Sequence, residues 1–131
     1  MVKLRVRRAR ACGFTLIELL VVLAIVALLL SVAVPRYFGS LEMSREVALK
    51  ENLKVLRGTL DKFYADKGRF PDSLNELVEQ QYLRAVPVDP ITETSTSWVV
   101  IPARGTAETG IADVRSGASG TGRSGTEYQQ W

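Results

Sequence analysis

The chain has 131 residues, of which 47% are hydrophobic, 24% charged and 8% aromatic, so it has room for one small domain with an appendage. It contains no histidine and one cysteine, which excludes Cys/His zinc sites, histidine-based catalytic triads and intramolecular disulfides. The formal charge is +3, yet without residues 1–13 the chain has 12 basic and 14 acidic residues. The basicity therefore belongs to a terminal leader, and we expect no binding to nucleic acid.

Residues 14–34 form the first predicted element, an apolar run whose only polar members are Thr15, Glu18 and Ser31. A helix over these residues would be ~31 Å long, which matches the ~30 Å hydrocarbon core of a bilayer. Basic residues precede the run, and Arg36 is the only basic residue for several positions after it. The positive-inside rule then predicts a single membrane pass with the amino terminus in the cytoplasm.

Glu18 is the unusual residue in this run, because a carboxylate inside a membrane helix costs roughly 2.5–3.5 kcal/mol and usually has a partner. One interpretation is that Glu18 lies near enough to the cytoplasmic end to reach lipid headgroups. The other is that cleavage after Gly13 creates the partner, an amino group on Phe14 about one helical turn away. Within one helix the geometry is poor, so the amine of one chain would meet Glu18 of a neighbouring chain that is offset along the axis.

The segment from Gly13 to Leu20 reads Gly-Phe-Thr-Leu-Ile-Glu-Leu-Leu, and with its basic leader and apolar helix it resembles the type IV prepilin signature. The resemblance implies that a prepilin peptidase cleaves between Gly13 and Phe14 and methylates the new amino group of Phe14. It also implies that Glu18 is the assembly glutamate and that Pro35 kinks the helix. A proline at that position frees the carbonyl four residues earlier.

After Pro35 the apolar residues follow a helical rhythm, which predicts an amphipathic helix that continues the membrane helix to Asp66. The stripe consists of Leu49, Leu53, Leu56, Leu60 and Phe63. We expect this stripe to pack on the chain's own sheet, with a separate coiled-coil partner as the alternative. Gly68 and Pro71 are typical of the end of a helix.

A second, short helix is predicted after Asp72 or Ser73, either of which can cap it, with Glu76 completing a capping box. Three short strands are expected beyond a proline-containing loop, at residues 97–101, 111–114 and 127–131. We expect the aromatic core residues to be Trp98, Tyr128 and Trp131. The predicted fold class is α+β, a type IV pilin-like fold in which a long N-terminal helix packs on a small antiparallel sheet.

Residues 68–71, 86–90 and 110–117 look like the corresponding parts of the major, G-type pseudopilin of type II secretion systems. Many type IV pilins have a cysteine pair in the C-terminal loop; here no cysteine follows Cys12, which favours a pseudopilin. The resemblance also implies calcium in this loop, and calcium needs roughly six to eight oxygen ligands. Between residues 110 and 131 the only carboxylates are Asp113 and Glu127. We therefore expect no metal or other cofactor, with a calcium ion as the alternative.

These observations predict a filament subunit that is not an enzyme, since no convergent polar site is evident. Residues 1–13 are its cleaved cytoplasmic leader, residues 14–34 its transmembrane and assembly helix, and residues 35–131 its periplasmic pilin-like domain. By resemblance, the chain sits in the bacterial inner membrane and polymerises with itself and other pseudopilins into a periplasmic pseudopilus that helps to export folded proteins across the outer membrane. Its further partners would be the prepilin peptidase and the inner-membrane assembly platform. The alternative is a type IV pilin for adhesion, motility or DNA uptake.

Overall fold

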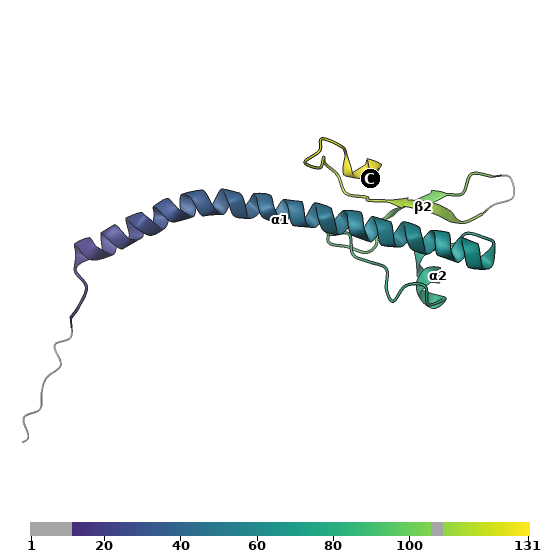
Figure 1. Cartoon of the computed structure of the whole chain (residues 1–131), viewed down its shortest axis with the longest axis horizontal. Helices are drawn as coiled ribbons and strands as arrows, with labels where there is room; N and C mark the ends of the chain where they lie inside the picture. Colours follow the sequence, from purple (N-terminus) through teal and green to yellow (C-terminus); the bar gives the residue numbers. More distant parts are fainter. Residues whose placement is uncertain (1–11, 106–108) are drawn as a thin grey trace, which may run out of the picture. The chain divides into compact units, whose positions relative to one another are not determined.

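The computed structural model describes residues 12–105 and 109–131, and the chain divides into two compact units, Met1–Phe38 and Gly39–Trp131. The elements in chain order are α1 (Leu16–Lys67), α2 (Leu74–Glu79), β1 (Val99–Pro102), β2 (Ile111–Arg115) and the 3₁₀ turn η1 (Tyr128–Gln130) (Figure 1). Of the predicted leader, Cys12 and Gly13 are described, whereas residues 1–11 lie outside the described residues.

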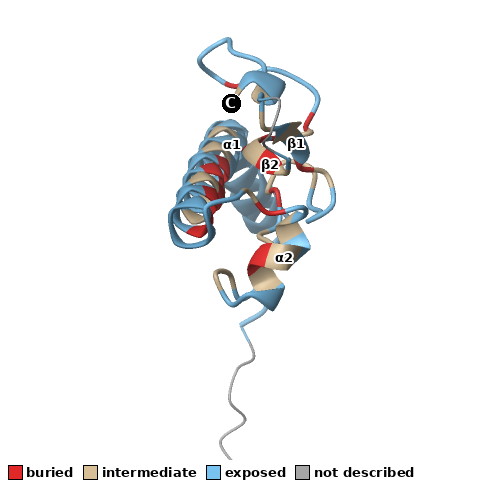
Figure 2. Ribbon diagram, turned by 90° about the vertical axis from the view of Figure 1, so that its right-hand side faces the viewer, coloured by how far each residue is buried: buried red, intermediate tan, exposed pale blue. Residues whose placement is uncertain are grey.

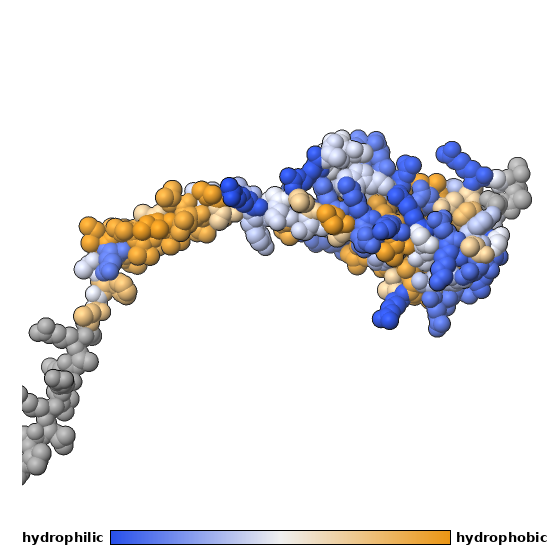
Figure 3. All heavy atoms as spheres, viewed as in Figure 1, coloured by the Kyte–Doolittle hydropathy of each residue, from blue (hydrophilic) through white to orange (hydrophobic). Residues whose placement is uncertain are grey.

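In the first unit, the described part of α1 exposes its apolar side chains on all sides. Every residue from 14 to 34 is exposed, and Phe14, Leu16 and Ile17 are more than 70% exposed. Figure 3 shows the hydrophobic surface that these side chains make along this part of α1. Within the described ranges, α1 is the one helix long and apolar enough to cross a membrane. A helix of this kind needs an apolar environment, such as lipid or other helices.

In the second unit, one face of α1 is buried by the rest of the same unit. The predicted stripe of leucines and Phe63 is confirmed as core, because these residues are at most 2% exposed. Leu77, Trp98, Ile111 and Val114 complete the buried cluster (Figure 2). The stripe therefore packs against the chain itself, as expected, and not against a separate coiled-coil partner. The helix ends one residue later than predicted, and Gly68 follows it with a φ of +70°.

The short helix α2 begins at a side-chain cap, and of the two candidates Ser73 is the N-cap. Its Oγ accepts a hydrogen bond from the N–H of Glu76 at 3.2 Å. The Glu76 carboxylate accepts from the N–H of Asp72 at 2.7 Å, one residue before the position that a standard capping box uses. Glu76 also forms an ion pair with Arg69 at 2.5 Å, so one carboxylate joins the turn after α1 to the start of α2.

The sheet has two antiparallel strands, with Val99 opposite Arg115 and Val100 opposite Val114. The prediction of a third strand at residues 127–131 is wrong, because this segment forms the turn η1 and only an isolated bridge pairs Glu127 with Thr121. A strand would point Tyr128 and Trp131 to opposite faces, whereas residues three apart in a 3₁₀ turn lie on the same side. Both rings thereby pack against the core, 5.2 Å apart, but they are half-buried at its edge, so of the three predicted aromatic core residues Trp98 alone is buried.

Candidate assembly site at the start of the long helix

The side chain of Thr15 caps the first turn of α1. Its Oγ1 accepts a hydrogen bond from the N–H of Glu18 at 3.3 Å, and its carbonyl accepts from the N–H of Leu19 at 3.2 Å. Thr15 and Glu18 thus have the spacing of a capping box, and an acidic residue in the first turn is favoured by the helix dipole. Our sequence reasoning missed this role of Thr15, although a threonine three residues before a glutamate is a recognisable signal.

The peptide bond between Gly13 and Phe14 lies in an accessible segment without regular structure, just before the helix. Phe14 is 85% exposed, and a Cβ added at Gly13 would meet no atom within 4 Å. Exposed backbone of this kind is what a protease can bind in an extended form. Helix α1 starts at Leu16, two residues later than the sequence predicts, so the predicted cleavage site stays outside the helix.

Glu18 lies beside this segment, and it lines a hollow of about 230 Å³ together with Cys12, Gly13 and Phe14. Three of the predicted site residues are therefore neighbours. Within residues 12–105 and 109–131, no cation forms an ion pair with the Glu18 carboxylate. A carboxylate beside a glycine–phenylalanine bond can supply a charge partner for the amine that cleavage creates. We assign it a role in pairing and not in catalysis.

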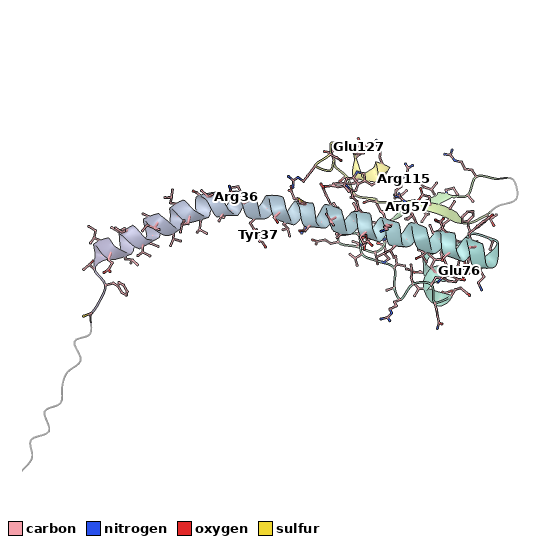
Figure 4. The ribbon with its side chains drawn as sticks, viewed as in Figure 1. Arg36, Tyr37, Arg57, Glu76, Arg115 and Glu127 are labelled. Atoms are coloured by element: carbon pink, nitrogen blue, oxygen red, sulfur yellow. The ribbon has the colours of Figure 1, made fainter. Side chains whose placement is uncertain are left out.

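Pro35 lies inside α1, which continues through it, and it marks the end of the apolar run. The side chain of Ser31, one turn earlier, donates to the carbonyl of Leu28 at 2.7 Å. Arg36 and Tyr37 follow directly and project from the helix (Figure 4). An arginine and an aromatic residue at this point are typical of the boundary between membrane and water. The kink expected at Pro35 stays a prediction.

The C-terminal segment has two carboxylate side chains that could hold a calcium ion, Asp113 and Glu127. Oδ1 of Asp113 accepts hydrogen bonds from Nε of Arg57 at 2.9 Å and from the N–H of Val114 at 2.8 Å. Glu127 is exposed at the surface. In the described parts of the chain, no three carboxylate or thiol side chains come together as a metal-binding group. With Asp113 paired to Arg57, the segment has few charged oxygen ligands for the calcium ion that the resemblance implies.

Comparison with known proteins gives several matches. The family described as "Prokaryotic N-terminal methylation motif" matches residues 8–34. The chain is 38% identical to the type IV major pilin protein PilA of Myxococcus xanthus over 50% of this chain, and this match spans 30% of that pilin's length. It is 33% identical to the type II secretion system core protein G of Klebsiella pneumoniae over 62% of this chain and 69% of the relative. It is 31% identical to the competence protein ComGC of Halalkalibacterium halodurans over 54% of this chain and 70% of the relative. No solved structure matches at a significant level.

Proposed function

Because this chain belongs to the family of type IV pilins and pseudopilins, which are structural proteins and not enzymes, we propose that it is a filament subunit of a type II secretion pseudopilus. One observation carries the proposal. Gly13, Phe14 and Glu18 lie together at the start of an exposed apolar helix. The proposed cleavage site is therefore adjacent to a carboxylate of the kind that would pair with the new amine of Phe14.

In the proposed pathway the chain is inserted in the inner membrane through residues 14–34, with residues 1–13 in the cytoplasm. A prepilin peptidase cleaves after Gly13 and methylates the amino group of Phe14. The membrane helices then leave the bilayer and bundle into the core of a periplasmic filament. Residues 35–131 lie on its outside, as the distribution of exposed and buried apolar side chains supports.

Electrostatics explain why a neighbouring glutamate is needed in this bundle. Cleavage puts a positive amine on Phe14, next to the start of α1, where the helix dipole already contributes about half a positive charge. An apolar bundle stabilises such a charge only through a close anion. Glu18 of a chain offset by about one turn, roughly 6 Å, supplies that anion and fixes the register between the two chains.

The choice of pseudopilus over pilus is supported by two features. The match to the Klebsiella core protein G spans 69% of that relative, whereas the match to the Myxococcus pilin spans 30% of the pilin. In addition, Cys12 precedes the proposed cut, so the mature chain would have no cysteine with which to close a C-terminal disulfide. A type IV pilin remains the second candidate because the Myxococcus pilin is 38% identical in the matched part.

The test is the substitution Glu18→Ala in a host with a prepilin peptidase and an assembly platform, with Glu51→Ala, another exposed carboxylate on α1, as the matched control. Loss of one partner from a buried ion pair costs roughly 3–5 kcal/mol, so filament yield should fall about a hundredfold or more. Membrane insertion and cleavage should persist, and the control should assemble. Abundant fibres from Glu18→Ala would refute the proposed role. Fibres that extend beyond the cell envelope would instead favour the pilin.

A further inference from the structure

The segment from Ser116 to Trp131 needs an external tie to hold one conformation. It contains four glycines and no regular structure apart from η1. Fixing such a chain costs conformational entropy that the segment's own short contacts do not offset. Its internal backbone hydrogen bonds are all local: the N–H of Gly122 donates to the carbonyl of Thr126 at 2.8 Å, and the N–H of Tyr128 donates to the carbonyl of Gly120 at 3.1 Å. A further anchor must come from outside the turn that these bonds close.

Asp89 holds the start of the segment through Ser116, and Glu46, which projects from α1, anchors the turn farther along. Its Oε1 accepts a hydrogen bond from the N–H of Arg123 at 2.8 Å and another from the hydroxyl of Tyr128 at 3.2 Å. One carboxylate oxygen therefore holds both sides of the turn, five residues apart along the chain. The guanidinium of Arg123 also reaches the carbonyl of Gly39 on the same helix, at 3.4 Å.

The close fit of the turn on the helix depends on a glycine. A Cβ added at Gly122 would lie 2.5 Å from the ring of Trp131 and 3.4 Å from Oε1 of Glu46. The Trp131 ring also contacts Lys50, whose Nζ lies 4.5 Å from the ring centroid, and the ring of Tyr128. The turn, η1 and α1 thus form one packed contact around the Glu46 carboxylate.

Calcium would order the segment by binding several of its oxygen atoms, but this chain offers few carboxylates for it. Asp113 is engaged by Arg57, and Glu127 is exposed on the C-terminal segment (Figure 4). We propose that Glu46 fixes the C-terminal segment on α1 in place of a metal ion, so that this chain orders its C-terminal segment without calcium. The inference concerns the folded chain and stands apart from the proposed function.

The test uses the full mature chain in detergent micelles, with calcium chloride or the chelator EGTA added. Thermal unfolding is followed by near-ultraviolet circular dichroism, and trypsin cleavage after Arg123 is followed by mass spectrometry. For the unsubstituted chain, we expect the same Tm and the same cleavage rate with calcium as with EGTA. A calcium-dependent rise of about 5 °C or more in Tm, or protection of Arg123 by calcium, would overturn the proposal.

Three variants distinguish the effect of losing the Glu46 carboxylate from the effect of any substitution on α1. Glu46→Ala should lower the Tm by about 5 °C or more and speed cleavage after Arg123 about tenfold, since two hydrogen bonds to a charged acceptor are lost. Glu46→Gln keeps an acceptor oxygen without the charge and should give an intermediate loss. The control Glu51→Ala should leave both readouts unchanged. If Glu46→Ala were as resistant at Arg123 as the unsubstituted chain, Glu46 would not be the anchor.

Discussion

Replacing Asp89 with alanine removes the carboxylate that holds the loop before β1 to the end of β2. Asp89 is fully buried. Its Oδ2 accepts from Oγ of Ser116 at 2.5 Å, and its Oδ1 accepts from the N–H groups of Ile91 at 2.8 Å and Thr92 at 3.3 Å. The bond from Ser116 is short, and each hydrogen bond to a charged acceptor contributes about 1.5–3 kcal/mol. We therefore expect Asp89→Ala to lose about 3–5 kcal/mol of unfolding free energy.

The assay is urea and thermal unfolding of the mature chain in detergent, read from the near-ultraviolet signal of Trp98, which is buried and donates its indole N–H to the carbonyl of Pro87 at 2.8 Å. The expected loss corresponds to a fall in Tm of roughly 12 °C or more for a domain of this size. Asp89→Asn keeps an acceptor for the two N–H groups and should lose about 1–2 kcal/mol. Asp61→Ala, at an exposed site on α1, should change stability by less than about 0.5 kcal/mol. A loss below about 1 kcal/mol in Asp89→Ala would refute the reasoning.

Three further predictions concern pH and packing. A hydrogen bond from Arg69 lowers the pKa of Glu76, so its stabilising contribution is present above the ordinary value of 4.5 and is lost as pH falls through the lowered pKa; Glu76→Gln should flatten the dependence of Tm on acid pH. Burial raises the pKa of Tyr128 above 10.0, so its contribution is lost as pH rises through the raised pKa, and Tyr128→Phe should remove that alkaline loss of Tm. Gly117→Ala would place a Cβ 1.9 Å from the carbonyl oxygen of Ser97, so urea unfolding should show a loss of about 2 kcal/mol or more, and an unchanged midpoint would contradict the close approach.

The long helix and its buried face could be predicted from the sequence because both depend on local periodicity. Apolar residues at spacings of three and four fix one face of a helix, and the buried positions from Leu49 to Phe63 match that face. The end of the helix at Gly68 and the cap at Ser73 also follow from neighbouring residue types. The segment from Gly13 to Glu18 could be recognised because its elements are contiguous in the chain.

The contacts that order the rest of the second unit could not be predicted in the same way. Asp89 meets Ser116 across 27 residues, and Glu46 meets Arg123 across 77 residues. Both contacts join residues far apart in the sequence, and helix or strand periodicity predicts contacts only between near neighbours. The aromatic residues at positions 127–131 favour a strand, but packing both rings on one side of the core requires a 3₁₀ turn instead.

The intact mass and amino-terminal sequence of the chain tests the central claim most directly. The protein would be purified from the membranes of a host with an active prepilin peptidase. The account predicts a chain that begins at Phe14, carries one methyl group on its amino terminus and lacks residues 1–13. A chain that keeps residues 1–13 would contradict the account, because Glu18 would then have no amine to pair with in a neighbouring subunit.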